Sequence, residues 1–259
     1  WFANVSNSFM YLEGFYTYLQ FEKRYSKNTL EAYSKDISQF QDFLIQEYQS
    51  DDPELLRVNH RQVRAWVIHL MNNNVTPKSV NRKISALKTY YRFLLKNNAI
   101  AKNPMAKVVS PKIPKKLPLF VEKTGMEELF DVLDQVYPVE TEVQRFVKQR
   151  DRLIVELLYS TGMRRAELLG LADNSFDRAQ QQVKVLGKGN KERIIPVSKG
   201  LMLMADDYIA ERKRIFGAGG PFIVTESGKP AYPKMIYNIV HQVLNHVTTL
   251  TRKSPHVLR

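Results

Sequence analysis

The stretch LLYSTGMRRAELLGL, residues 157–171, combines a helix-ending turn with two charged side chains on the helix that follows. Gly162 is suited to end the first helix, and a second helix begins directly after it. On that second helix Arg164, Glu167 and Leu168 lie at i, i+3 and i+4, so they share one face. Because an arginine on an apolar face needs a partner, the spacing predicts a half-buried Arg164 that is paired with Glu167. In most proteins such a pair has a structural role.

The composition of the chain excludes several classes of protein. Its 259 residues are 44% hydrophobic and 25% charged, which is ordinary for a globular protein and leaves room for two domains. No apolar run approaches the roughly 18 residues that cross a bilayer, and Glu13 interrupts the apolar N-terminal stretch, so neither a membrane span nor a secretory signal is expected. The absence of cysteine excludes disulfides and is compatible with the cytoplasm, where we place the protein. Because its histidines are scattered, we expect no metal and no cofactor.

Positive charge is concentrated in one segment of the chain. The formal net charge is +13, and residues 76–121 carry most of it, since they contain basic but no acidic side chains. Such a segment indicates a nucleic-acid partner, and a merely solvated basic face is the alternative. The basic residues of this segment are Lys78, Arg82, Lys83, Lys88, Arg92, Lys96, Lys102, Lys107, Lys112, Lys115 and Lys116.

The first hundred residues show helical periodicity. They predict a short helix near residues 9–20 and three further helices within residues 26–48, 59–74 and 76–98. The last of these begins with Thr-Pro and is amphipathic. Its predicted apolar face contains Val80, Ile84, Leu87, Tyr91, Leu94 and Leu95. Its predicted outer face is basic and contains Lys78, Arg82, Lys83, Lys88 and Arg92.

The chain is expected to contain two domains joined by a linker. Residues 1–102 form the helical domain, the proline-rich and basic residues 103–119 form an extended linker, and residues 120–259 form a domain of mixed type. In the second domain the sequence predicts helices at 125–136, 143–160, 201–216 and 232–250, a hairpin within residues 181–197 and a short strand at 222–224.

Two further motifs place cations where they could reach a substrate. Lys188 lies in the glycine-flanked turn of the predicted hairpin, a position where a lysine is usually just solvated. His256 and Arg259, in the terminal SPHVLR, lie at i and i+3 at a predicted helix start. Together with Arg164 they would suit one phosphodiester. Arginine can bind two non-bridging oxygens, lysine can protonate a leaving oxygen, and the set can neutralise the developing charge without a metal.

The sequence resembles the tyrosine site-specific recombinases, or phage integrases, and within them the Xer-type chromosome-dimer recombinases. The resemblance covers nearly the whole chain, in five segments that occur in the family's order. These are SKNTLEAYSKDISQF from residue 26, SVNRKISALKTYYRFLLKNNAIAKNP from residue 79, LLYSTGMRRAELLGL, GKGNKERIIPV from residue 187 and SPHVLR.

The resemblance implies a role for each matching residue. Arg164 and Arg259 would be the two catalytic arginines, Glu167 the acidic residue that orients the site, Lys188 the general acid and His256 the catalytic histidine. The first and second segments would contribute DNA contacts. The residues expected to contact DNA are Asn28, Thr29, Tyr33, Lys78, Ser79, Arg82, Lys83, Lys88, Arg92, Lys112, Lys115 and Lys116.

The resemblance also implies a fold and an activity. The fold would be mainly helical, with a four-helix, SAM-like core-binding domain and an α+β catalytic domain that carries a small β-hairpin. The two domains would clamp duplex DNA, cut it through a transient 3′-phosphotyrosine and exchange strands within a tetramer on paired sites. A paralogous recombinase and a DNA translocase are possible partners, and chromosome partition and DNA integration are possible roles.

One feature departs from the family pattern. No tyrosine follows Arg259, where the family places its nucleophile, so we expect that residue beyond Arg259 and expect this chain to bind DNA without cutting it. The residues before Met10 are expected to be an expression remnant, since relatives often begin near that position. The alternatives are a non-catalytic DNA-binding regulator with the same fold, a type IB topoisomerase and, less supported, an RNA-binding protein.

Overall fold

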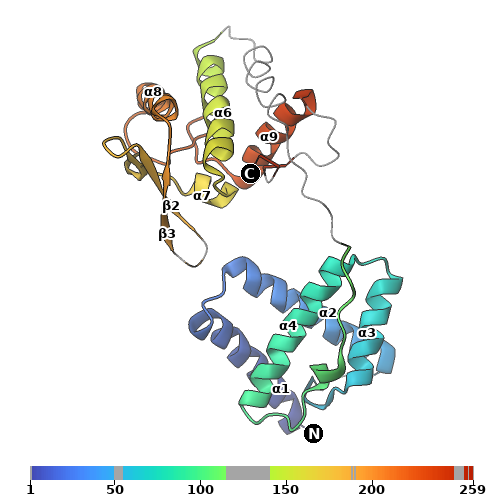
Figure 1. The fold of residues 1–259 in the computed structure, drawn as a ribbon. Helices are drawn as coiled ribbons and strands as arrows, with labels where there is room; N and C mark the ends of the chain where they lie inside the picture. The colour runs from blue at the N-terminus through green and yellow to red at the C-terminus, as the bar shows by residue number, and fades with distance from the viewer. Residues whose placement is uncertain are drawn as a thin grey trace. The chain divides into compact units, whose positions relative to one another are not determined.

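The computed structural model of the chain divides into two compact units, residues 1–116 and 117–259. It describes residues 2–49, 55–114, 141–187, 189, 191–247, 254, 255, 257 and 258, with the side chains of residues 2–8, 246 and 247 left out. Helices dominate both units, and the second also contains a small antiparallel sheet, which confirms the predicted fold class (Figure 1). No helix within the described ranges is long and apolar enough to cross a membrane.

The first unit is a helical domain, as predicted. Its elements are α1 (Phe2–Thr17), the π-helix η1 (Tyr18–Glu22), α2 (Lys27–Tyr48), the short η2 (Leu55–Arg57), α3 (His60–Asn72), α4 (Pro77–Lys96) and the short η3 (Pro104–Lys107). Local sequence explains where two of them begin. The Asn59 side chain accepts hydrogen bonds from the Arg61 and Gln62 amides at the start of α3. Thr76 accepts one from the Ser79 amide, and Pro77 occupies the first position of α4.

The core of the first unit lies between α1, α2, α3 and α4, and aromatic side chains fill much of it. The rings of Phe40 and Trp66 join α2 to α3 with centroids 4.9 Å apart, and those of Phe15 and Tyr90 join α1 to α4 at 5.1 Å. Most of the predicted apolar face of α4 is buried there, except Leu95, which is exposed. Helix α4 therefore packs against three other helices and presents one outer face.

The segment after α4 folds back onto this unit. Asn103 accepts a hydrogen bond from the Met105 amide and begins η3, and the side chains of Met105 and Val108 are buried in the core. The Asn81 side-chain amide donates to the Pro111 carbonyl oxygen at 2.9 Å, which fixes the following residues to α4. The first residues of the predicted 103–119 linker are thus packed onto the first unit, with Met105 and Val108 in its core, and residues 115–119 lie outside the described ranges.

The second unit begins, in its described part, with a long helix. Its helices are α6 (Glu142–Thr161), α7 (Arg165–Leu169), the short η4 (Asp173–Ser175), α8 (Lys199–Phe216) and α9 (Pro233–Val247). Thr141 and Gln144 form reciprocal capping bonds at the start of α6, and Gly162 ends it in the left-handed conformation at φ 59°, as the sequence predicts. The predicted helix at 125–136 lies outside the described residues.

The three strands of the second unit are β1 (Phe176–Asp177), β2 (Gln182–Leu186) and β3 (Glu192–Pro196), paired antiparallel in the order β1–β2–β3. The predicted hairpin is therefore present, with Val183 opposite Ile195 and Val185 opposite Arg193. The prediction of a strand at 222–224 was wrong, because only an isolated bridge between Val224 and Pro230 forms there. The apolar run at 222–224 reflects burial in the core.

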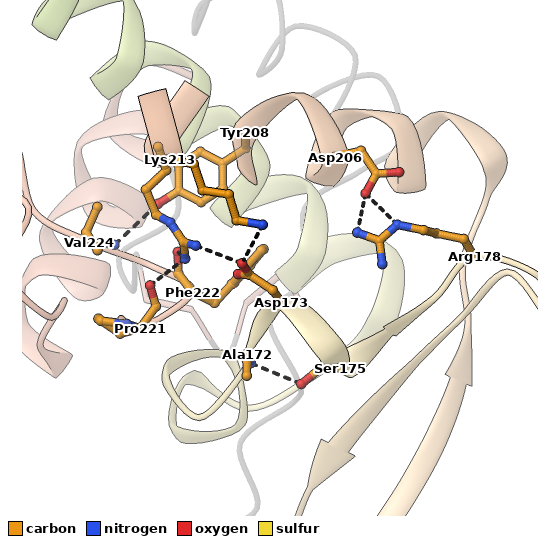
Figure 2. A network of polar contacts seen from close by, with 11 residues as sticks. Ala172, Asp173, Ser175, Arg178, Asp206, Tyr208, Lys213, Pro221, Phe222 and Val224 are labelled. Atoms are coloured by element: carbon orange, nitrogen blue, oxygen red, sulfur yellow. Dashed lines mark hydrogen bonds and ion pairs between the residues drawn. The ribbon is translucent and has the colours of Figure 1, made fainter. Parts of the chain in front are cut away.

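A buried arginine, Arg212, connects three parts of the second unit, and Figure 2 labels its partners Asp173, Pro221 and Phe222. Arg212 on α8 donates to the Pro221 carbonyl oxygen at 2.6 Å and to the Phe222 carbonyl oxygen at 3.2 Å. Its other terminal nitrogen donates to the Asp173 carboxylate at 2.8 Å. Because Asp173 begins η4, two residues after the stretch that contains α7, this network fixes the position of α7 relative to α8.

Candidate active site and nucleic-acid interface

A buried carboxylate organises the start of α7. The Glu167 side chain is 3% exposed, and its Oε2 accepts a hydrogen bond from the Arg164 backbone amide at 2.7 Å. Its Oε1 accepts another from the Arg164 guanidinium, whose Nη1 lies 2.8 Å away. Arg164 is the residue that caps the helix, so one carboxylate fixes both its backbone and its side chain. The predicted partnership of these two residues is confirmed.

Arg164 is half-buried beside its partner, as the spacing predicts, whereas Glu167 is fully buried. The Arg164 side chain is 46% exposed, because it caps a helix of only five residues and does not lie on a longer apolar stripe. A guanidinium carries five N–H groups. Only one of its nitrogens is held by Glu167 in the described part of the chain, so its other edge is open to a ligand. An arginine fixed in this way is pre-organised to bind the oxygens of a phosphate in a bidentate manner.

A second arginine, which the sequence analysis did not single out, shares the same carboxylate. Arg193 on β3 donates from Nη2 to Glu167 Oε2 at 2.8 Å, and its side chain is 40% exposed. A signal for it was present in the sequence. Arg193, Ile195 and Val197 alternate along the strand, which places the arginine on the inward face, where a charged side chain needs a partner.

The charge state of Glu167 follows from this arrangement. Burial on its own raises the pKa of the Glu167 carboxyl, but the hydrogen bonds from the Arg164 amide and guanidinium and the charge of Arg193 outweigh it. The pKa of Glu167 therefore lies below its ordinary value, and the carboxylate is ionised at neutral pH. Two guanidiniums around one carboxylate leave a net positive charge that faces solvent.

The other three predicted catalytic residues are outside the described part of the chain. Lys188, His256 and Arg259 are not described, so their roles remain predictions. Gly187, which directly precedes Lys188, is described. A Cβ atom on it would lie 3.5 Å from Glu167 Oε1 and 3.3 Å from the Lys191 carbonyl oxygen. The base of the hairpin turn is therefore in close contact with the Arg164–Glu167 pair.

The predicted basic face of α4 is largely present on the outside of the first unit. Lys78, Arg82 and Arg92 are exposed, and Ser79 and Lys88 are partly buried. Lys112 is also exposed and directly follows Pro111, which is bonded to Asn81 on α4. We refer to the exposed and partly buried cationic residues together as the α4 basic face: Lys78, Arg82, Lys88, Arg92 and Lys112. Lys115 and Lys116 lie outside the described residues.

Lys83 does not belong to this face, which corrects the prediction. It is 6% exposed, and its Nζ donates to Asp36 Oδ1 on α2 at 2.9 Å and also to the Gln39 side chain. Helical spacing explains the difference, since Lys83 lies three residues after Val80 and four before Leu87, both buried. Arg82, although exposed, also forms an ion pair with Asp36.

The three predicted contacts on α2 lie near its start. Asn28 is exposed, and Thr29 and Tyr33 are partly buried. The Tyr33 ring packs edge-on against Tyr25 with centroids 5.9 Å apart. Burial raises the pKa of the Tyr33 hydroxyl, which therefore remains protonated at neutral pH. These residues can form hydrogen bonds with a nucleic-acid backbone, but they contribute no charge to it.

Comparison with known proteins gives matches over both units. Residues 12–98 match the model of the phage integrase N-terminal SAM-like domain, and residues 121–259 match that of the phage integrase family. The tyrosine recombinase XerC of Chlorobaculum tepidum is 34% identical over 96% of this chain and 80% of its own length. XerC of Bacillus licheniformis is 33% identical over 99% of this chain and 82% of its own length.

Solved structures give the same picture of the fold. The XerH recombinase bound to a palindromic difH substrate matches with a TM-score of 0.70 at 16% identity, covering 88% of this chain and 66% of that one. A lambda integrase tetramer bound to a Holliday junction matches with a TM-score of 0.67 at 16% identity, covering 96% of this chain and 67% of that one. At these identities the structures support the fold alone.

Proposed function

Because the chain belongs to the phage integrase family of tyrosine recombinases, we propose that it binds duplex DNA at a specific site and takes part in breaking and rejoining its strands. The observation that carries this proposal is the geometry at Glu167. A buried carboxylate holds Arg164 by its backbone and its side chain while nearly half of that side chain stays open to solvent.

The proposed reaction is a transesterification at a phosphodiester. Arg164 and Arg259 bind the non-bridging oxygens and stabilise the charge of the transition state. Lys188 protonates the leaving 5′ oxygen, and His256 assists proton transfer and charge stabilisation. Glu167 keeps Arg164 in the orientation that the phosphate requires. A tyrosine hydroxyl attacks the phosphorus to form a 3′-phosphotyrosine, and reversal of this step rejoins the strands.

DNA binding is proposed to occur through the α4 basic face and the start of α2. The exposed cations of this face are suited to phosphates, while Asn28, Thr29 and Tyr33 offer neutral hydrogen-bonding groups. Because lysine and arginine side chains displace counterions from the DNA duplex, such binding depends strongly on the salt concentration. With about 6–10 phosphate contacts, affinity should fall roughly 10³–10⁵-fold between 50 and 200 mM salt, and a flat response would exclude this surface.

A trapping experiment tests the chemical part of the proposal. We propose that none of the tyrosines within residues 1–259 is the nucleophile, so we expect these residues to bind a nicked suicide substrate without forming a covalent adduct. We expect a form of the protein that supplies the nucleophile to give an adduct with a 3′-phosphate that survives denaturing gel electrophoresis. An adduct formed by the 259-residue chain would show that the nucleophile lies within it.

The assembly and cellular role are also proposals. We propose a tetramer on paired DNA sites, like the lambda integrase tetramer bound to a Holliday junction, and we propose a paralogous recombinase and a DNA translocase as partners and the bacterial cytoplasm as the location. Analytical ultracentrifugation with one and two DNA sites tests the tetramer. Relaxation of a supercoiled plasmid without recombination of paired sites would instead favour a topoisomerase, and binding without any strand cutting would favour a regulator.

A further inference from the structure

We infer that Arg193 is a positioning residue for the active site, which holds the base of the β2–β3 hairpin against Glu167 and thereby fixes the orientation of Arg164. The inference deepens the proposed function and rests on it for its catalytic consequence. Arg193 connects the sheet to α7. It lies on β3, and its guanidinium binds the Glu167 carboxylate, which also binds Arg164.

The geometry makes the two arginines interdependent. Glu167 Oε2 accepts from both the Arg164 amide and Arg193 Nη2, while Oε1 accepts from Arg164 Nη1. A carboxylate group is planar, so a hydrogen bond that holds one of its oxygens also limits the positions that the other oxygen can take. Arg193 thus restrains the carboxylate that sets the direction of the Arg164 guanidinium. Within the described residues, Glu167 is the only hydrogen-bond partner of the Arg193 guanidinium, whose buried Nε has none.

The Arg193–Glu167 contact also holds the turn of the β2–β3 hairpin in place. The Gly187 amide donates to the Lys191 carbonyl oxygen at 2.8 Å and closes the end of the ladder, and a Cβ atom at Gly187 would lie in van der Waals contact with Glu167 Oε1, at 3.5 Å. Arg193 is paired with Val185, two residues before Gly187. Loss of the Arg193–Glu167 bond should therefore loosen the end of the ladder that leads to Lys188 and leave the inner end, at Val183, in the core.

The opposite face of the hairpin provides a matched control. Lys184 on β2 and Glu192 on β3 form an ion pair with a distance of 3.1 Å, and both side chains are more than half exposed. This pair joins the same two strands but does not contact Glu167. If Arg193 only strengthened the hairpin, Lys184→Gln and Arg193→Gln would have similar effects.

The experiment uses Arg193→Gln, Arg193→Lys and the control Lys184→Gln in the full-length protein. At saturating DNA we expect Arg193→Gln to lower the single-turnover cleavage rate about 10–100-fold, the range of one charged hydrogen bond. DNA affinity and its salt slope should stay unchanged. Arg193→Lys should recover part of the rate, because an ammonium can reach one carboxylate oxygen. Lys184→Gln should cleave at the wild-type rate.

Three outcomes would overturn the inference. A salt slope smaller by about one in Arg193→Gln would show a direct phosphate contact. An equal loss in Lys184→Gln would show a general stabilising role for the hairpin. A wild-type cleavage rate in Arg193→Gln would show no role at all.

A second measurement is independent of cleavage and so separates this inference from the proposed function. In the 259-residue chain without DNA, Arg193→Gln should speed amide hydrogen exchange at Gly187 about tenfold or more and leave exchange at Val183 unchanged. If the wild-type protein cuts no DNA, the proposed function fails, and this exchange pattern alone decides whether Arg193 seats the hairpin. Unchanged exchange at Gly187, or equal acceleration at both amides, would overturn it.

Discussion

Asp36 in the first unit and Glu167 in the second are both buried carboxylates that bind two cationic side chains, but they expose those cations differently. Asp36 binds the buried Lys83, whose side chain is 8% exposed, and the half-exposed Arg82. Glu167 binds Arg164 and Arg193, which are both close to half exposed. The comparison shows that a buried acid can hold a buried cation between two helices, as Asp36 holds Lys83, or can hold exposed cations alone, as Glu167 does.

The largest effect is expected from removing Asp36. Asp36→Ala leaves the buried Lys83 ammonium without its carboxylate, which should lower the free energy of unfolding by about 3–5 kcal/mol. Urea denaturation followed by circular dichroism measures the change. The control is Asp206→Ala, which breaks the exposed pair with Arg178 and should cost less than about 1 kcal/mol. Equal effects of the two substitutions would contradict the structural role of Asp36.

Arg164→Ala should lower the rate of DNA cleavage, whereas Asp36→Ala should lower the stability of the fold. In a form of the protein that cuts a suicide substrate, we expect cleavage to slow about 10²–10³-fold, the range for loss of one donor to a developing charge, with most DNA binding retained. Single-turnover cleavage and a binding titration measure the two quantities. Arg165→Ala is the control, since Arg165 is exposed and donates to the Pro233 carbonyl oxygen. A near-normal rate in Arg164→Ala would remove this residue from the proposed site.

The corrected position of Lys83 gives a smaller but specific prediction. Arg92→Ala should weaken DNA binding and lower the salt slope by about one, because Arg92 is exposed on α4 and is proposed to contact a phosphate. Lys83→Ala should lower stability and leave the salt slope unchanged, because Lys83 is bound to Asp36 inside the domain. Binding isotherms at several salt concentrations test both. A lower slope in Lys83→Ala would restore it to the DNA-contacting set.

The smallest effect concerns pH. Hydrogen bonds from Arg164 and the charge of Arg193 outweigh burial and keep the pKa of Glu167 below its ordinary value of about 4.5. The folded state thus binds this proton less readily than the unfolded state. The stabilisation is complete above about pH 4.5 and is lost as the pH falls through the lowered pKa. Glu167→Gln should make the unfolding free energy less dependent on pH in this window, as measured by urea denaturation at several pH values.

Much of the fold follows from local sequence signals, because capping and periodicity act over a few residues. Asn59, Thr76 and Gly162 mark helix ends in the sequence and do so in the structure. The i, i+3 spacing also gave the pairing of Arg164 with Glu167. These signals need no knowledge of which elements pack together.

The features that the sequence analysis missed depend on tertiary contacts or on weak patterns. Lys83 was placed outside by its charge, although its spacing from Val80 and Leu87 fits the buried face, and only Asp36 on another helix makes that position tolerable. Arg193 required combining strand alternation with a carboxylate 26 residues earlier. The run at 222–224 was taken for a strand because apolar composition alone does not distinguish a ladder from a buried loop.

The Arg212 network has a consequence for the order in which the chain folds during synthesis. The described core of the first unit uses residues up to Val108, so a ribosome that has released that much chain has supplied what this core needs. In the second unit, Asp173 can form its ion pair only after Arg212 has been synthesised. Arg212 in turn needs the carbonyl groups of Pro221 and Phe222, which are synthesised later still. The support behind α7 is therefore completed only after residue 222 has emerged. A growing chain would therefore acquire the helices that we propose to bind DNA well before Arg164, which we propose to bind the phosphate, is held in place.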